Sequence, residues 1–237
     1  MPPEPGDRLC LAADPRNGES ERRPTPLLRT RRAPGGLPER GETMSMLERM
    51  LAGELYHADD PELQARYARA QQVLAAFNAT GPGDWVRRSE LLHELLGAVG
   101  EGVVVQPSLR LDYGCNVRIG AGTFVNYDSV LLDVAPITIG EDCQIATRVQ
   151  LLTATHPVDP VARRAGWESG APIELGDNVW LGGGAIVLPG VTIGADTVVG
   201  AGAVVTRDLP AGVVAVGSPA RVIREITETD RVTMPTR

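Results

Sequence analysis

The chain has 237 residues, of which 43% are hydrophobic and only 4% aromatic, and its net charge is −7. The hydrophobic fraction excludes wholesale disorder, and the acidic balance argues against a nucleic-acid-binding protein with a basic face. All 23 basic residues are Arg, which excludes Lys-dependent chemistry such as a Schiff base. The 3 Cys residues form no CxxC pair, so no disulfide framework or zinc knuckle is expected. No apolar run approaches the roughly 18 residues of a membrane helix, and the beginning of the chain lacks the apolar core of a signal peptide. We therefore expect a cytoplasmic protein.

Residues 1–43 differ in composition from the rest of the chain. They contain eight Pro and eight Arg but no aromatic residue. Such a segment cannot bury enough apolar surface to offset its ordering entropy, so we predict a disordered tail. The cluster of Arg29, Arg31 and Arg32 could indicate an anionic partner, but seven acidic residues in the same segment nearly cancel the charge. We therefore favour a solvated tail.

Residues 44–100 are predicted to form a helical segment. Asp60 is a typical N-cap, followed by Pro61 at the first helical position, and Gly81–Gly83 interrupt the helix. Apolar residues recur at helical spacing in all three predicted helices. They are Leu47, Met50, Leu51 and Leu55, then Leu63, Tyr67, Ala70, Leu74 and Phe77, then Leu91, Leu92 and Leu95.

From about residue 101, aliphatic residues recur every six positions. They are Ile119, Val125, Leu131, Ile139, Ile145, Leu151, Leu175, Leu181, Val187, Ile193, Val199 and Val205. A period of six is typical of the hexapeptide repeats of a parallel β-helix, in which about 18 residues complete a triangular coil. Gly follows several of these positions, and we expect it at corners where backbone strain would penalise a side chain. The sequence predicts a mainly β protein with this β-helix over 101–210 and a C-terminal segment over 211–237.

One long segment, 157–174, interrupts the repeats. Loops that leave a rigid scaffold often carry functional sites. His156, immediately before it, is the only His of the repeat region, and Glu168 lies inside it. His57 and His93 lie in the helical segment, where we interpret them as surface or packing residues.

Several further motifs are characteristic of a known family. They are Asp112-Tyr113-Gly114, Phe124-Val125-Asn126, Thr155-His156-Pro157, Gly176-Asp177-Asn178-Val179-Trp180-Leu181-Gly182, Pro189-Gly190-Val191-Thr192-Ile193-Gly194 and Gly217-Ser218-Pro219-Ala220. With these motifs, residues 46–227 resemble the hexapeptide-repeat O-acetyltransferases of the maltose, galactoside and nodulation-sugar group. The resemblance implies a left-handed β-helix with N-terminal helices, a homotrimer with active sites between subunits, and acetyl-CoA as acyl donor.

The resemblance also implies roles for particular residues. It makes His156 the general base and places Asn126 at the reaction centre. It assigns acceptor contacts to Asp112 and Asn126, and we add Glu168 from the long segment. The residues expected to bind the donor are Trp180, Gly183, Ala201, Thr206, Arg207, Arg221 and Arg224. Departures from relatives fall mainly on the acceptor side, at His57 and Val134, so the particular sugar is left open.

An imidazole with a pKa near 6.5 suits removal of a proton from a sugar hydroxyl as it attacks the thioester. We expect direct transfer without a covalent enzyme intermediate and without a metal. A γ-type carbonic anhydrase would need three His ligands, whereas His156 is alone in the repeats, and a serine acetyltransferase would need a longer helical domain. An acetyltransferase acting on antibiotics or natural products stays open as the alternative, and a non-catalytic scaffold is a weaker one.

Overall fold

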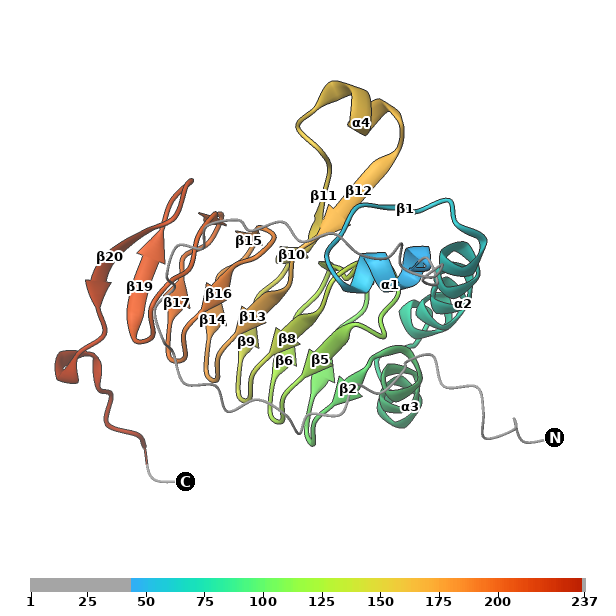
Figure 1. Ribbon diagram of the computed structural model, residues 1–237. Helices are drawn as coiled ribbons and strands as arrows, with labels where there is room; N and C mark the ends of the chain where they lie inside the picture. Colours follow the sequence, from blue (N-terminus) through green and yellow to red (C-terminus); the bar gives the residue numbers. More distant parts are fainter. Residues whose placement is uncertain (1–43, 236–237) are drawn as a thin grey trace, which may run out of the picture.

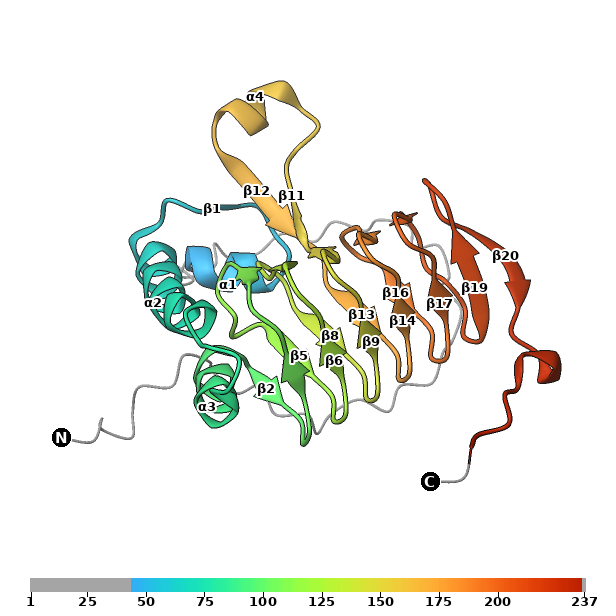
Figure 2. The ribbon, with the colours of Figure 1, turned by 180° about the vertical axis from the view of Figure 1, so that it is seen from behind.

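The computed structural model describes residues 44–235, so the predicted disorder of residues 1–43 lies outside the described residues. The described chain is a solenoid with helices at one end and an antiparallel strand pair at the other (Figure 1). A separate hairpin projects from its side, which is also clear from behind (Figure 2). No helix within residues 44–235 is long and apolar enough to cross a membrane.

The predicted helical segment contains three helices, and the second begins at the predicted position. The first is shorter than predicted: Leu55, expected on its apolar face, lies beyond its end and is exposed, and Leu51 at its last position is exposed too. Helix α1 (Met46–Leu51) starts with a capping box between Ser45 and Glu48, and α3 spans Trp85–Leu95. Helix α2 (Pro61–Asn78) starts at Asp60, whose side chain accepts hydrogen bonds from the N–H groups of Glu62 and Leu63. The apolar faces of α2 and α3 cover the first coil of the solenoid, and residues such as Phe77 and Leu95 are fully buried there.

Three parallel sheets form the faces of the solenoid, and the chain visits them in turn. The first sheet contains β2 (Ala98–Val99), β5 (Val117–Ile119), β8 (Ile137–Ile139), β13 (Ile173–Leu175) and β16 (Thr192–Ile193). The second contains β3 (Val104–Val105), β6 (Phe124–Val125), β9 (Gln144–Ile145), β14 (Trp180–Leu181), β17 (Val198–Val199) and β19 (Val213–Val216), extended by antiparallel β20 (Arg221–Glu225). The third contains β4 (Leu109–Leu111), β7 (Ser129–Leu132), β10 (Gln150–Leu152), β15 (Ile186–Val187) and β18 (Val204–Val205). A short 3-10 turn, η1 (Glu228–Asp230), follows β20.

The register of these sheets stacks equivalent hexad positions on one another. Val125 pairs with Ile145, which pairs with Leu181, which pairs with Val199. All twelve predicted hexad aliphatics are at most 3% exposed, which confirms the β-helix and its inward-facing positions. One further coil, with hexad residues Val99, Val105 and Leu111, precedes the coils predicted from the sequence.

Backbone strain, the reason predicted for the corner glycines, does not explain the glycines that follow the hexad aliphatics. Gly120 and Gly182, which directly follow aliphatic hexad residues, are not among the glycines with positive φ. They are required because the next coil lies too close: a Cβ at Gly120 would come within 2.5 Å of the Gly140 carbonyl carbon. Positive φ occurs two residues after these glycines, for example at Gly122 and Gly184. Steric stacking of coils therefore selects the first set of glycines.

The long segment is a β-hairpin. Its strands are β11 (Ala154–Thr155) and β12 (Trp167–Gly170), and the short helix α4 (Pro160–Arg164) lies between them. Strand β1 (Tyr56–His57), from between α1 and α2, pairs antiparallel with β12. The His57 ring packs against the Trp167 ring, with centroids 3.8 Å apart and a tilt of 43°, which confirms a packing role for His57. The N-terminal segment thus pairs with the returning strand of the hairpin, whose tip with α4 projects away from the solenoid (Figure 1).

The stacking explanation can be tested with two glycine substitutions. Gly120→Ala should lower the free energy of unfolding by about 1–3 kcal/mol, because the added methyl group overpacks the contact with the next coil. Gly102→Asn should cost less than about 1 kcal/mol, because Gly102 has a φ of 71° that Asn tolerates and open space for a side chain. Thermal unfolding followed by circular dichroism measures both. Equal losses would show that corner conformation, and not stacking, selects these glycines.

Candidate active site

The predicted catalytic residues lie at opposite edges of the third sheet. Asn126 lies at the corner that precedes β7, whereas His156 lies on the hairpin that follows the neighbouring strand β10. One side of such a coil is roughly 20 Å long. His156 is exposed, and Asn126 is half-buried with its side-chain Oδ1 accepting a hydrogen bond from the Tyr127 N–H at 2.8 Å. Within one chain, the fold therefore does not bring Asn126 and His156 together.

An acidic cluster lies beside the foot of the hairpin, the point near Thr153 and Gly170 where its two strands join the solenoid. Asp112 follows β4 and is half-buried, and Glu168 comes from β12. The hydroxyl of the fully buried Tyr56 donates to Glu168 Oε2 at 3.3 Å. Burial, together with the nearby Asp133 and Glu168 carboxylates, raises the pKa of Asp112 to about 7. Burial also raises the pKa of Tyr56 and Tyr113, so both phenols keep their protons. The cluster can offer protonated and unprotonated oxygens to the hydroxyl groups of a ligand.

Asp133 supports this cluster from below. Its carboxylate is fully buried and accepts backbone N–H bonds from Asp112 at 3.0 Å, Tyr113 at 2.8 Å and Asn116 at 3.2 Å. Burial raises the pKa of Asp133, while these N–H donors act in the opposite direction. Since three N–H groups converge on one carboxylate, the bend over 112–116 has little freedom to move.

Two predicted donor-binding residues stack at the corner between the second and third sheets. Gly183 and Ala201 lie on successive coils, joined by a hydrogen bond from the Gly202 N–H to the Gly183 carbonyl at 2.9 Å. The N–H groups on either side of Gly183 donate to neighbouring coils, but within residues 44–235 those of Gly183 and Ala201 take no part in this ladder. Two backbone donors on adjacent coils are thus available to a ligand. Asn126 lies at the same corner, on an earlier coil.

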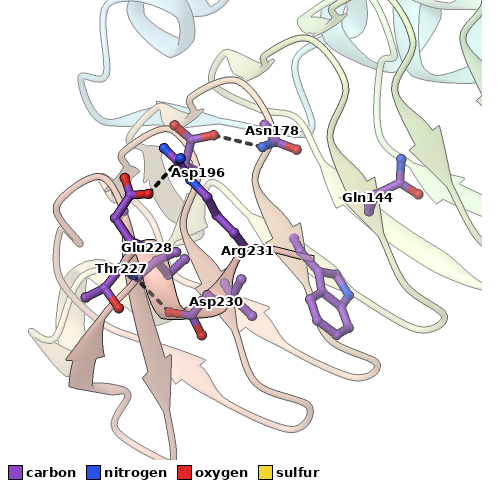
Figure 3. A pocket seen from close by; sticks show the side chains of 11 residues that line it. Gln144, Asn178, Asp196, Thr227, Glu228, Asp230 and Arg231 are labelled. Carbon is purple, nitrogen blue, oxygen red and sulfur yellow. Dashed lines mark hydrogen bonds and ion pairs between the residues drawn. The ribbon is translucent and has the colours of Figure 1, made fainter. Parts of the chain in front are cut away.

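The other predicted donor residues lie elsewhere on the chain. Thr206 and Arg207 are exposed and follow β18, at the same edge of the third sheet as the hairpin. Trp180 lies on the outer face of the second sheet and is 53% exposed. It borders an open groove of about 1080 Å³, whose other side is formed by residues 226–231 of the C-terminal segment (Figure 3).

The two predicted phosphate-binding arginines lie on β20. The Arg224 guanidinium forms an ion pair with Asp230 at 2.8 Å, and Arg221 donates to the Ala220 carbonyl. A single chain therefore presents the donor residues in three separate places: the corner at Gly183, the edge at Thr206 and the outer face of the second sheet.

Sequence reasoning missed three residues of the acidic cluster: Tyr56, Tyr113 and Asp133. A Tyr between two predicted helices is a weak signal, although rings are rare in this chain. Tyr113 was noticed only as part of a motif. Asp133 had no signal, because nothing in the hexad pattern shows that its carboxylate is buried under the bend over 112–116. Among residues 44–235, no group of three or more His, Cys, Asp or Glu is arranged to hold a metal ion.

Comparison with known proteins defines the class of this site. A family model for the maltose acetyltransferase hexapeptide capping motif matches residues 49–100, and one for bacterial transferase hexapeptide (six repeats) matches residues 172–207. Nodulation protein L of Rhizobium meliloti (strain 1021) is 51% identical over 181 residues, which cover 76% of this chain and 98% of that protein.

Two solved structures agree in fold over most of the chain. A maltose O-acetyltransferase from Clostridium difficile 630 has 43% identity and a TM-score of 0.77, covering 79% of this chain and 100% of that one. A galactoside acetyltransferase in complex with coenzyme A has 38% identity and a TM-score of 0.76, covering 79% and 94%. The fold, together with these relatives, thus identifies a hexapeptide-repeat acyltransferase. The chain belongs to the maltose and galactoside O-acetyltransferase family, which confirms the predicted resemblance.

The raised pKa of Asp112 makes stability depend on pH. The folded state keeps this proton up to about pH 7, whereas in the unfolded chain the carboxyl group has its ordinary pKa of 3.8. Ionisation of Asp112 therefore lowers stability as the pH rises through this window. Asp112→Asn should raise the free energy of unfolding at pH 8 by on the order of 1–3 kcal/mol, and the gain should vanish near pH 4.

Denaturant unfolding at several pH values measures this difference. Asp59→Asn, at an exposed position between β1 and α2, is the matched control and should show no such trend. A gain that is the same at pH 4 and pH 8 would contradict the assignment of the proton to Asp112.

Proposed function

We propose that the protein transfers the acetyl group of acetyl-CoA to a hydroxyl of a sugar or glycoside, with His156 as general base. Family membership carries this proposal, together with the placement of His156 on the hairpin next to the acidic cluster. The His156 imidazole removes the proton of the acceptor hydroxyl as its oxygen attacks the thioester carbonyl. The tetrahedral intermediate then collapses, the acetyl ester forms, and the proton passes from His156 to the departing thiolate. The enzyme itself is never acetylated.

The N–H groups of Gly183 and Ala201 lie at the corner between the second and third sheets, outside the hydrogen-bond ladder of the described coils. They support a role of this corner in binding the donor. Fixed backbone donors stabilise developing negative charge because they need no reorganisation when the charge appears. We assign Gly183 and Ala201 to this side, along with Trp180, Thr206, Arg207, Arg221 and Arg224. In this assignment the donor phosphates displace Asp230 from Arg224, since the two compete for the same guanidinium.

The active site lies between subunits of a homotrimer in this proposal. Two observations support it. Asn126 and His156 occupy opposite edges of the third sheet, so a neighbouring chain is needed to bring such a pair together. The outer face of the third sheet is also mostly apolar and half-buried, with Arg110 and Gln150 as its polar exceptions, whereas the first sheet presents polar, exposed residues to solvent. The apolar residues of the third sheet are Val130, Leu132, Leu152, Ile186, Leu188 and Val204, and the polar residues of the first sheet are Arg118, Thr138, Glu174 and Thr192.

Asp112 and Glu168 are assigned to the acceptor. Sugars carry several hydroxyl groups, and carboxylates beside phenols are suitable hydrogen-bond partners for them. An assay of thiol release from acetyl-CoA separates the proposed acceptor class from the alternatives. The acceptors compared are maltose, a galactoside, an aminoglycoside and a hydroxylated antibiotic. Turnover with the antibiotics alone would replace the sugar acceptor, and no turnover with any of them would argue for a scaffold.

The role of His156 is tested by substitution. His156→Ala should lower kcat by about 10²–10⁴-fold, the usual contribution of a general base, with acetyl-CoA binding changed little. His93→Ala is the control, because His93 is exposed on α3, away from the hairpin. Near wild-type turnover in His156→Ala would remove His156 from the mechanism.

The shared site is tested by mixing two inactive variants. Co-expressed Asn126→Ala and His156→Ala chains should regain about one quarter of the sites, because random assortment places an intact Asn126 and an intact His156 at that fraction of interfaces. Each variant expressed alone is the control. If the two residues acted within one chain, the mixture would have no more activity than the variants alone. Light scattering that shows a monomer would contradict the trimer directly.

A further inference from the structure

Thr153 marks the point at which the chain leaves the solenoid. It follows β10, and after the hairpin Ala171 returns the chain to β13. Thr153 is fully buried, although it is polar and lies only three residues before the exposed His156. Its position makes it the foot of the segment that carries the proposed base.

The hydroxyl of Thr153 bridges two groups of the preceding coil. Its Oγ1 donates to the Leu132 carbonyl at 2.6 Å and accepts from the Ala135 N–H at 3.0 Å. The Thr153 carbonyl in turn accepts from the Ala171 N–H at 3.0 Å. One residue thus attaches the outgoing strand to the coil and the returning chain to the outgoing strand.

The returning strand is packed equally closely. Gly170 pairs with Ala154, and a Cβ at Gly170 would come within 2.8 Å of Val134 Cγ2 and 3.2 Å of the Thr153 carbonyl oxygen. The foot of the hairpin is therefore closely packed, so the outgoing and returning strands can shift only together. Loss of the Thr153 hydroxyl would leave the buried Ala135 N–H without its acceptor, and the foot would have to move to satisfy it.

We propose that Thr153 is a positioning residue: its hydroxyl holds the foot of the hairpin against the coil and thereby sets the location of the His156 imidazole. This inference rests on the proposed function in so far as it concerns catalysis. Displacement of a catalytic group by about 1 Å can cost on the order of 100-fold in rate. A role in stability alone would lower the melting temperature without moving His156.

The chain offers a matched control. Thr197 is also fully buried, and its Oγ1 donates to the Pro210 carbonyl at 2.7 Å and accepts from the Val213 N–H at 3.4 Å. It bridges neighbouring coils in the same manner, at the other end of the solenoid and away from the hairpin. Thr197→Val removes the same kind of bridge as Thr153→Val, and Thr153→Ser keeps the hydroxyl while removing the methyl group.

The experiment compares these three variants in the full-length protein. Melting temperature, kcat, and KM for acetyl-CoA are measured with the acceptor, maltose or a galactoside, that supports turnover. We expect Thr153→Val to lower kcat by about 10- to 100-fold with KM for acetyl-CoA within about twofold, Thr153→Ser to retain most of kcat, and Thr197→Val to lose stability but not kcat.

A second readout does not depend on activity. The chain contains 3 His, so carbon-13-labelled histidine gives three ring signals that His→Ala variants assign. Thr153→Val should shift or broaden the His156 signal and leave that of His93 unchanged, whereas Thr197→Val should leave both unchanged. An unmoved His156 signal in folded Thr153→Val, or a Thr153→Ser variant as impaired as Thr153→Val, would overturn the proposal. If His156→Ala proves fully active, the proposed function fails, and the His156 signal alone then decides whether Thr153 positions this ring.

Discussion

The contact between successive coils decides where every other part of this protein can lie. Strands of neighbouring coils are only about 4.8 Å apart, so their backbones hydrogen-bond along the whole solenoid. Inside, this spacing admits one aliphatic side chain per hexad, and at corners such as Gly120 it admits no side chain. Residues that can contact a ligand therefore lie at the corners, on the outer faces and in the segments that leave the solenoid. All the residues assigned to the reaction lie in those places.

Stacking of the coils also makes the scaffold rigid enough to hold carboxylates whose burial costs free energy. Asp112, Asp133 and Glu168 lie close together, and burial together with the charges of the other two carboxylates raises the pKa of Asp112. The buried Asp133 carboxylate is retained because three backbone N–H groups converge on it. A hydrogen bond from a fully buried phenol likewise holds Glu168. The cluster that we assign to the acceptor is therefore organised before any ligand arrives.

The helical segment and the hairpin depend on each other. Strand β1 extends the hairpin sheet, and the His57 ring packs against Trp167, so neither element is held by the solenoid alone. The same segment supplies Tyr56 to the acidic cluster. The capping helices thus do more than cover the end of the sheets, since they shape the side of the hairpin nearest Asp112.

The sequence by itself determined the β-helix, its inward-facing positions, the capping helices and the excursion after His156. These features follow from local periods and caps, which do not depend on distant contacts. His156 could be singled out because a lone imidazole at the main interruption of a repeat stands out without any coordinates. Only the tertiary structure decided that the next coil leaves no room for a side chain at Gly120. It also decided that Asp133 holds the bend carrying Asp112, and that Tyr56 contacts Glu168, 112 residues further along the chain. It alone placed Asn126 and His156 at opposite edges of one sheet. Each of these relations joins residues on different coils or elements, and the hexad pattern specifies which side chains face inward but not which neighbours they meet.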